Sequence, residues 1–351
     1  MDRHQGRIGL DLAMKAGLAV RDLEFVAWAP LAVKGTNVVL PIGMLADGAT
    51  LHHSNGTPLD VELTADSTKL SEAIISKGDV VLDARDMGES SVWWSQTFEL
   101  VLQRLGINMK KQTVSVQPRV ATTIGGIATD EHGRAVIGRW SRWFTGLYAA
   151  GDSACSGLHG AGLIAGNRLL DAVAGGAAAG EHAAEHAKKT SHTGRATIEA
   201  ALGAVEADLD FDMAGAEEGP VQRVGPLYSK LSDIMQSNMG HMKDATSLQS
   251  ALDSLEALAD SASKVHLDDS GRLYNTNLLE SLRLKAGIRL AIASTRSAMS
   301  RTESRGTHQR SDFEEEDAEQ LHHTLVDSEG NLSTLAIRKG ASGTWTLAPG
   351  E

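Results

Sequence analysis

The sequence is poor in cysteine and in proline. Its 351 residues include one Cys and 7 Pro. The single cysteine, Cys155, excludes a disulfide within the chain and any metal site that is built from several thiolates. An iron–sulfur cluster is held by several cysteine thiolates, so such a cluster would have to belong to another chain.

Long apolar runs and a surplus of positive charge are also missing. No run of about 18 apolar residues occurs, so no helix of this sequence is expected to span a membrane. Residues 1–5 (MDRHQ) contain no apolar stretch, and no secretory signal is visible. The formal net charge of −12 argues against nucleic acid as a partner, because binding it needs clustered positive charge.

What the chain does contain is a globular composition with much glycine. Hydrophobic residues make up 42% and charged residues 22%, which is typical of a folded chain of one or two domains. The 36 Gly residues indicate many tight turns, or places where the backbone approaches a ligand closely.

Hydrophobic periodicity predicts a mixed α/β chain whose second half is mainly helical. We expect helices at residues 7–19, 70–75, 91–105, 167–188, 195–208, 222–240, 247–264 and 275–302. We expect strands at residues 23–28, 79–83, 113–118, 121–130 and 146–151, a turn at residues 55–56 and a terminal hairpin at 331–347. The first strand is expected to end at Pro30, and residues 311–320 to form a solvated acidic face.

The segment 146–170 carries the pattern with the most chemistry. A strand ends at Gly151 and Asp152, a glycine-rich loop follows, and a helix begins near Asn167. Backbone amides at a helix N-terminus carry partial positive charge and suit a phosphate or the carbonyl edge of a flavin, while the Asp152 carboxylate suits ribityl or ribose hydroxyls. Four small residues would allow a flat ring near the backbone: Ala161, Gly162, Ala165 and Gly166. The alternative is a loop whose glycines only allow close packing of a helix on a strand.

Residues 146–161 (GLYAAGDSACSGLHGA), followed by 166–171 (GNRLLD), resemble the second flavin-contacting block of the succinate dehydrogenase/fumarate reductase flavoprotein family. L-aspartate oxidase and adenylylsulfate reductase share that fold. Further blocks resemble the family, in family order, within residues 7–326: 9–17 with 24–26, 124–130, 274–280, 301–312 and 323–325. The last blocks lean toward succinate dehydrogenase and fumarate reductase rather than aspartate oxidase.

The resemblance implies an α/β fold with an α+β capping region, a C-terminal helical bundle and the C-terminal half of a FAD-binding flavoprotein fold. The implied segments are the end of the first flavin-domain segment (1–30), a reduced capping region (31–115), a second flavin-binding segment (116–190), a C-terminal helical domain (195–326) and a tail hairpin (327–351). FAD is the implied cofactor, and the implied cofactor-binding residues are Gly151, Asp152, Gly166, Asn167, Arg168 and Leu169. Arg168 replaces a family serine beside the flavin pyrimidine edge, and it either stabilises negative charge there or faces solvent.

The chain departs from the family at its front. The family opens with a strand–GxGxxG–helix unit that binds the ADP half of FAD, and this sequence contains no such unit. We therefore expect half of a flavin site, whose GxGxxG half is either on a separate chain or was lost in gene calling. The resemblance also implies electron exit to an iron–sulfur partner subunit, with the protein in the cytoplasm or peripherally on the inner face of the cell membrane.

The second departure concerns the residues that bind a dicarboxylate in the family. Residues 28–30 (WAP) replace the family's Phe-His-Pro, and residues 121–122 (AT) replace its His-Tyr. The family's catalytic and substrate-binding positions are occupied here by Ala29, Ser67, Ala121 and Leu163. A dianion needs guanidinium partners, and hydride transfer to or from it needs a proton donor or acceptor, so no catalytic residue is assigned and succinate or fumarate is not expected as substrate. Arg85 is the nearest basic substitute, but it more simply follows the family's strand Leu-Asp-Leu-Arg.

Three interpretations stay open. The favoured one is a FAD-dependent oxidoreductase that needs an N-terminal half which is missing from this sequence. The second is a non-catalytic or truncated homologue that is kept for assembly. The third is a family member with a different substrate, as in adenylylsulfate reductase or aspartate oxidase.

Residues outside the flavin loop have structural explanations beside functional ones. His182 and His186 lie at i, i+4 and form either a metal pair or, more simply, a solvated helix face, and no metal site is predicted. Packing or ion pairing is the favoured role of five others: Trp94, Cys155, Glu303, Arg305 and His308.

Overall fold

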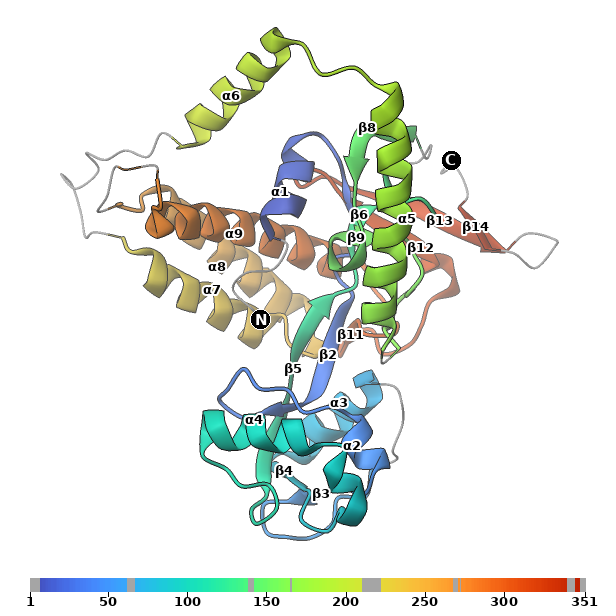
Figure 1. Ribbon diagram of the computed structural model, residues 1–351, viewed down its shortest axis with the longest axis vertical. Helices are drawn as coiled ribbons and strands as arrows, with labels where there is room; N and C mark the ends of the chain where they lie inside the picture. Colours follow the sequence, from blue (N-terminus) through green and yellow to red (C-terminus); the bar gives the residue numbers. More distant parts are fainter. Residues whose placement is uncertain are drawn as a thin grey trace. The chain divides into compact units, whose positions relative to one another are not determined.

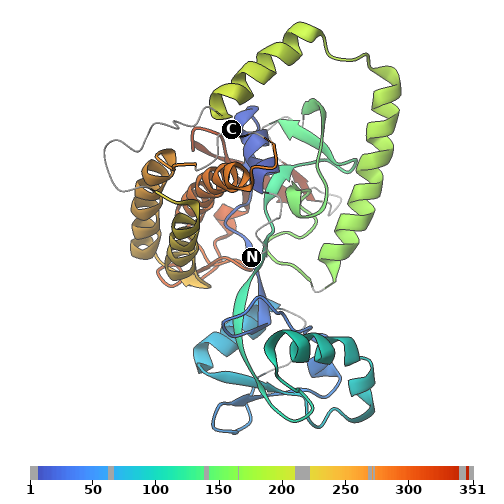
Figure 2. The same ribbon diagram turned by 60° about the vertical axis from the view of Figure 1, so that its left-hand side comes forward.

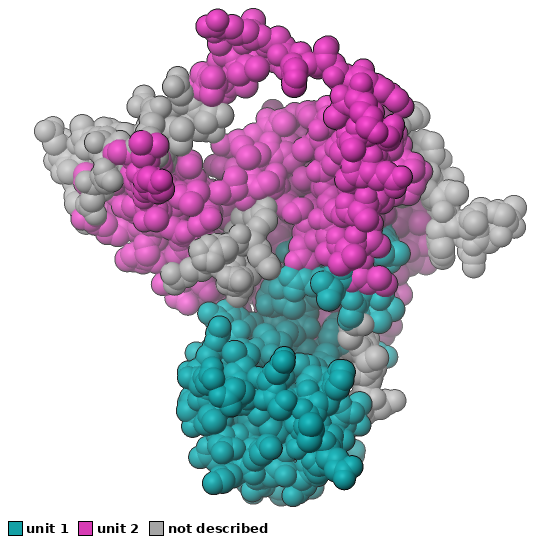
Figure 3. Space-filling model, viewed as in Figure 1, with its two compact units in different colours: residues 1–5, 25–124, 157–169 teal, residues 6–24, 125–156, 170–351 magenta. Residues whose placement is uncertain are grey.

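The structure of the protein is a computed structural model (Figure 1) that describes residues 7–61, 67–137, 142–164, 166–209, 222–267, 271, 273–339 and 345–347. The chain forms two compact units, which are coloured separately in Figure 3. Unit 1 comprises residues 1–5, 25–124 and 157–169, and unit 2 comprises residues 6–24, 125–156 and 170–351. The chain passes between the two units several times. The division into five segments at residues 1–30, 31–115, 116–190, 195–326 and 327–351, which the family resemblance implies, stays a prediction.

Unit 1 contains a four-stranded antiparallel sheet in the order β2-β5-β4-β3. Its strands are β2 (Val26–Val33), β3 (Thr50–His53), β4 (Val80–Asp83) and β5 (Val114–Thr123). Its helices are α2 (Gly43–Ala46), α3 (Ser67–Lys77), the 3-10 helix η1 (Gly88–Val92) and α4 (Ser95–Leu105). The turn expected after β3 is confirmed, with Gly56 at a φ of +87°.

Strand β2 runs through Pro30 rather than ending there, which corrects the expectation from the sequence. Proline lacks an N–H and cannot take part in a regular hydrogen-bonded ladder. The β2–β5 pairing shifts register between Ala29 and Ala32, and Pro30 lies within that irregular stretch. The strand continues because Leu31 and Val33 beyond it are buried in the core of unit 1.

Helix α4 covers the core of unit 1 with a narrower apolar face than the sequence indicates. Phe98 and Val101 are buried, whereas Leu102, expected on the same face, is exposed. Helix α4 ends at Gly106, whose φ of +71° is the left-handed conformation common at helix C-termini. Trp94, just before α4, packs against the core, and its Nε1 donates to Asp47 at 2.8 Å, which confirms its packing role.

Unit 2 contains a six-stranded sheet in the order β14-β13-β12-β1-β6-β9. Its strands are β1 (Val20–Arg21), β6 (Gly126–Ala128), β9 (Ala154–Cys155), β12 (His322–Val326), β13 (Leu332–Lys339) and β14 (Trp345–Leu347). A separate hairpin joins β7 (Arg134–Ile137) to β8 (Arg142–Tyr148). The terminal hairpin expected from the sequence is confirmed as β13–β14, and β12 connects it to the rest of the sheet.

The helices of unit 2 follow the expected positions to within a few residues. They are α1 (Arg7–Lys15), α5 (Asn167–Lys189, whose first turn belongs to unit 1), α6 (Arg195–Leu209), α7 (Val224–Asn238), α8 (Ala245–Ser263) and α9 (Thr276–Ser300). Short elements are η3 (Gly151–Ser153), β10 (Met242–Lys243), β11 (Gln309–Arg310) and η4 (Ala318–Gln320). Among the described residues, no helix is both long and apolar enough to cross a membrane.

Helices α7, α8 and α9 lie side by side in both views and enclose an apolar core (Figures 1 and 2). Leu231 of α7, Leu255 of α8 and Leu284 of α9 belong to this core. Helix α8 begins with a capping box, in which the Asp244 side chain accepts from the Ser247 amide at 2.7 Å. These helices form the helical part of unit 2 that the sequence indicates.

Candidate flavin-binding site

The flavin loop, residues 149–166, connects β8 to α5 and begins in unit 2. Gly151 opens η3 with a φ of +56°, and a Cβ atom on it would lie 3.1 Å from the Cβ of Ala172 on α5. Glycine is therefore required here both by the backbone conformation and by the packing of η3 on α5. Asp152 follows within η3 and is exposed. Its carboxylate is thus held on a short, packed turn rather than on a free loop.

The second part of the flavin loop, in unit 1, is built from glycines in left-handed conformations. Gly157, Gly160 and Gly166 have φ values of +85°, +56° and +88°. A Cβ atom on Gly160, Gly162 or Gly166 would meet nothing within 4 Å. Gly160 and Gly166 are needed by the shape of the chain and not by packing against protein, and the backbone beside Gly160, Gly162 and Gly166 is open to a ligand. Ala165, predicted as part of this small-residue set, lies outside the described residues.

Helix α5 begins at Asn167, as the sequence predicts, and its first turn presents backbone amides. The Asn167 amide donates to Ile164 O at 3.1 Å, which closes the loop onto the helix. Arg168 is half-buried, and Leu169 is exposed. Leu169, Leu170 and Val173 expose 73%, 65% and 65% of their surface. Such an apolar stripe at the start of a helix is typical of a surface that another group covers.

The predicted substrate positions lie in unit 1 and carry no group suited to a dianion. Ala29 of β2 stands opposite Arg119 of β5. Ala121 of β5 has no partner in this pairing, because the register shifts between Val120 and Thr122 on either side of it. Leu163 packs with Ala161 against an apolar cluster: Phe25, Ala27 and Ile124. Ser67 is buried at the start of α3, where its carbonyl accepts from the Ser71 hydroxyl at 2.6 Å.

Two guanidinium groups of unit 1, those of Arg85 and Arg119, are engaged in hydrogen bonds within the protein. Arg85 pairs with Asp83 through Nε and Nη2, at 2.9 and 2.6 Å, and this pair lowers the pKa of Asp83. Arg119, which the sequence reading did not single out, donates from Nη1 to Thr36 O at 2.7 Å and to Asn37 Oδ1 at 2.5 Å. Its place opposite Ala29 depends on the strand register, which the sequence alone does not reveal.

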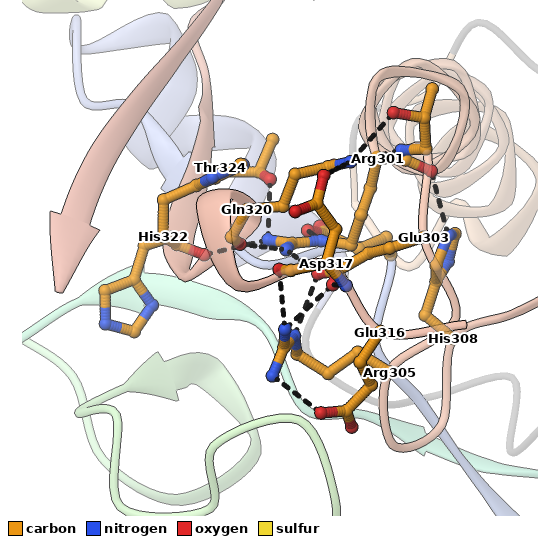
Figure 4. A network of polar contacts seen from close by, with 12 residues as sticks. Arg301, Glu303, Arg305, His308, Glu316, Asp317, Gln320, His322 and Thr324 are labelled. Atoms are coloured by element: carbon orange, nitrogen blue, oxygen red, sulfur yellow. Dashed lines mark hydrogen bonds and ion pairs between the residues drawn. The ribbon is translucent and has the colours of Figure 1, made fainter. Parts of the chain in front are cut away.

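A network of buried charges lies at the C-terminal end of α9 in unit 2 (Figure 4). Arg301 donates to Glu24 at 2.9 Å and to Glu303 at 2.8 Å, and all three side chains are shielded from solvent. Arg305 holds Glu303 through two hydrogen bonds of 2.8 Å each. Burial alone would raise the pKa of Glu303, but the hydrogen bonds from Arg305, the Asp317 amide and Arg301 bring it below its usual value. Glu303 and Arg305 therefore form structural ion pairs, as predicted.

The third residue of that motif, His308, is buried in the same region. Burial, and then the positive charge of Lys243, lower the pKa of His308 to about 2. The imidazole is therefore neutral at any pH near neutrality and cannot serve as a proton donor there. The lowered pKa of His308 agrees with the structural rather than catalytic role that the sequence favours for it.

His182 and His186 contact aromatic rings rather than lying on a plain solvated face. The Tyr148 hydroxyl and His182 Nδ1 are hydrogen-bonded at 3.0 Å, and the His186 ring lies 4.6 Å from that of Trp143. His132 stacks on His182 with ring centroids 5.0 Å apart. Within the described part of the chain, no group of three or more His, Cys, Asp or Glu residues is arranged to hold a metal ion.

Comparison with known proteins defines the class to which this fold and loop belong. A FAD binding domain model matches residues 6–169, and a "fumarate reductase flavoprotein C-term" model matches residues 228–349. The fold is thus that of a FAD-binding flavoprotein, and the match begins at residue 6, which corrects the expectation that only the C-terminal half of that fold is present. The chain belongs to the succinate dehydrogenase/fumarate reductase flavoprotein family.

Curated relatives and solved structures agree with this membership. The chain is 30% identical to the fumarate reductase flavoprotein subunit of Escherichia coli, over 92% of this chain and 58% of that protein. It is 27% identical to the succinate dehydrogenase flavoprotein subunit of Coxiella burnetii, over 97% of this chain and 61% of that protein. A solved E. coli quinol fumarate reductase matches with a TM-score of 0.79 and 28% identity, over 97% of this chain and 60% of that one.

A more distant solved structure shows the same fold only. Adenylylsulfate reductase of Archaeoglobus fulgidus matches with a TM-score of 0.63 at 14% identity, over 96% of this chain and 60% of that chain. The chain spans less than two thirds of the length of the relatives it matches.

Proposed function

We propose that this chain is the flavoprotein component of a FAD-dependent oxidoreductase and that its flavin loop contacts the cofactor. The observation that carries the proposal is the flavin loop, in which an exposed carboxylate on a packed turn precedes open glycines and a helix N-terminus. These groups suit the parts of a flavin. The carboxylate suits the hydroxyls of the ribityl chain, the glycines leave room for the flat ring, and the helix amides suit the electron-rich carbonyl edge of the ring.

In this proposal each part of the loop has one role toward FAD, which supplies hydride chemistry when bound. Asp152 accepts hydrogen bonds from the ribityl hydroxyls. The amides of Arg168 and Leu169 donate to the carbonyl edge of the ring, and the Arg168 guanidinium offsets negative charge there. Gly166 keeps the backbone free of side chains where the ring lies.

The substrate is neither succinate nor fumarate. A dianion needs bidentate guanidinium partners, and hydride transfer to or from it needs a proton donor or acceptor on the far side of the reacting carbon. Ala29, Ala121 and Leu163 supply neither, and removing one such group typically costs about 10² to 10⁴ in rate. A different substrate, as in adenylylsulfate reductase or aspartate oxidase, accounts for these replacements.

A non-catalytic role in assembly is the second candidate, and one observation favours it. Ala161 and Leu163 of the flavin loop pack directly on Phe25, Ala27 and Ile124. Apolar side chains of the protein thus occupy positions where a substrate-binding arginine is expected.

The proposed partners supply what this sequence does not contain. A GxGxxG unit, on another polypeptide or on a part of the protein outside this sequence, holds the ADP half of FAD, and the exposed apolar stripe on α5 gives such a unit a surface to cover. An iron–sulfur subunit takes the electrons, since this chain has a single cysteine. The assembly works in the cytoplasm or on the inner face of the cell membrane.

One experiment tests the proposed function. The protein is purified alone and together with any GxGxxG protein encoded beside it, and the flavin absorbance spectrum is recorded. Steady-state assays then compare succinate, fumarate, aspartate and adenylylsulfate. Bound flavin with no succinate or fumarate turnover is the expected result. Measurable succinate turnover contradicts the argument from Ala29, Ala121 and Leu163. An absence of flavin in every preparation contradicts the oxidoreductase proposal and supports the non-catalytic role in assembly.

A further inference from the structure

Asp22, directly after β1, is a buried carboxylate that joins three segments of unit 2. Its Oδ2 lies 2.5 Å from His323 Nδ1, and its Oδ1 accepts from the Thr324 amide at 3.0 Å. The Cys155 thiol donates to the same Oδ2 at 3.6 Å. Asp22 is 4% exposed. One side chain thus contacts the end of β1, strand β12 and strand β9.

Two glycines allow these segments to come together. A Cβ atom on Gly125 would lie 2.3 Å from the carbonyl oxygens of both Arg21 and Asp22. A Cβ atom on Gly126 would lie 2.7 Å from Ser153 O. No real Cβ atom tolerates such distances from backbone oxygens, so glycine is required at both positions for the chain to close around Asp22.

Strand β9 has little else in the sheet to hold it. It is two residues long and lies at the edge of the sheet, where its strand partner within the described residues is β6, through Ile127 with Ala154 and Ala128 with Cys155. Cys155 O also accepts from the Thr129 amide at 3.3 Å and from Arg21 Nη1 at 3.5 Å. Two backbone pairs at an edge are marginal on their own. The hydrogen bond from Cys155 to Asp22 therefore adds a side-chain anchor to a weak strand.

The backbone of Asp22 is strained, which indicates that its contacts determine its position. Its φ is +59°, a left-handed conformation that only a few percent of non-glycine residues adopt. Such a conformation persists where the surrounding contacts over-determine it. Here those contacts are the three hydrogen bonds of the carboxylate and the bond of the Asp22 amide, which donates to Thr324 O at 2.9 Å.

We propose that Asp22 and His323 are positioning residues for the flavin loop. Strand β9 follows η3 directly, so the anchor on Cys155 also holds the turn that carries Asp152. The inference rests on the proposed function for its link to FAD. Asp22 and His323 touch no predicted flavin-contacting residue, and they act on the cofactor only through Cys155 and the short turn before it.

The test uses the full chain and its only thiol. Variants Asp22→Gly and His323→Leu remove the anchor, and glycine keeps the left-handed backbone without strain. His323→Asn places an amide N–H close to the position of Nδ1 and is the conservative partner. Asp11→Asn is the matched control, because Asp11 is also a buried aspartate of unit 2 and pairs with Arg289 at 2.6 Å, outside the flavin loop.

Two readouts are taken from each variant. The rate at which dithiobis-nitrobenzoate labels Cys155 reports on β9, and a titration with FAD gives the dissociation constant. Asp22→Gly and His323→Leu are expected to raise both by about tenfold, the change produced by losing one hydrogen bond to a charged group. His323→Asn and Asp11→Asn are expected to stay within about twofold of the parent.

The outcomes separate this inference from the proposed function. Equal labelling rates in Asp22→Gly, His323→Leu and Asp11→Asn overturn the anchor. Faster labelling with an unchanged FAD dissociation constant overturns its role toward the cofactor. If the parent protein binds no FAD either alone or together with a GxGxxG partner, the proposed function fails, while the labelling rates still decide whether Asp22 holds β9.

Discussion

Arg301 donates from Nε to Glu24 Oε1 at 2.9 Å, and both side chains are fully shielded from solvent. The pKa of Glu24 is raised, first by burial and then by the charge of Asp22, while Arg301 acts in the opposite direction. The remaining donors of Arg301 go to Glu303, the Gln320 and His322 carbonyls and the Thr324 hydroxyl. A single guanidinium thus joins the end of α9 to the segment after β1 and to β12.

Removing this guanidinium should be among the most damaging single changes to stability. Arg301→Met leaves the Glu24 carboxylate buried without its ion-pair partner and removes one of the donors to Glu303, a loss of about 3–5 kcal/mol by analogy with other broken buried pairs. Urea unfolding followed by circular dichroism measures it. Lys34→Ala breaks an exposed pair with Asp79 and is the control, with an expected change below about 1 kcal/mol. Similar losses in the two variants would contradict the structural role of the Arg301 network.

Lys243 should make stability rise with pH in the alkaline range. Burial, and then the charge of Arg310, lower its pKa from 10.5 to about 8. Between pH 8 and pH 10.5 the folded state binds fewer protons than the unfolded state, so the free energy of unfolding rises with pH over this range. The contribution of Lys243 is fully present above pH 10.5 and is lost as the pH falls through 8. The gain is on the order of 3 kcal/mol. Unfolding midpoints at pH 7.5 to 10.5 should show this rise in the parent and not in Lys243→Met; parallel curves would refute it.

Glycine positions should divide into those that packing requires and those that are open. Gly125→Ala places a Cβ atom 2.3 Å from two backbone oxygens and should destabilise unit 2 by at least about 3 kcal/mol. Gly162→Ala meets nothing within 4 Å and should change stability by less than about 0.5 kcal/mol. Thermal melting of both variants decides this. A stable Gly125→Ala protein would mean that the chain does not close around Asp22 as described.

Asp152 should matter for flavin affinity and not for folding. Asp152→Asn removes a charged acceptor on an exposed turn, and the FAD dissociation constant should rise about tenfold with little change in melting temperature. Asp260→Asn is the matched control, since Asp260 is an exposed aspartate of α8 that pairs with Lys264. An unchanged dissociation constant in Asp152→Asn would remove this residue from the proposed flavin site.

Local features of the sequence predicted well where the glycine-rich loop gives way to α5, and they predicted most helices. A glycine-rich stretch followed by a long run of good helix formers predicted the start of α5 at Asn167, because both signals act over neighbouring residues. The same logic failed at Pro30, since the burial of Leu31 beyond it is a tertiary contact that outweighs the local break.

Contacts between distant residues explain what the sequence did not predict. Asp22 and His323 are 301 residues apart, and Arg301 and Glu24 are 277 apart. No periodicity links such pairs, and a lone Asp or His in a chain with 45 acidic residues and 13 His carries no signal. The family motif around Glu303 indicated ion pairing but not its partners. The place of Arg119 opposite Ala29 likewise depends on strand register, which a one-residue slip would change.

The position of β1 in the sheet has a consequence for the order in which unit 2 folds. Val20 pairs with Val326 on one side and with Ile127 on the other, so this two-residue strand has neighbours made much later in synthesis. A ribosome has to complete β12 before β1 can take its place and Asp22 can meet His323. Unit 2 therefore cannot close until residues up to Val326 have emerged from the ribosome, and its apolar residues stay exposed to chaperones until then.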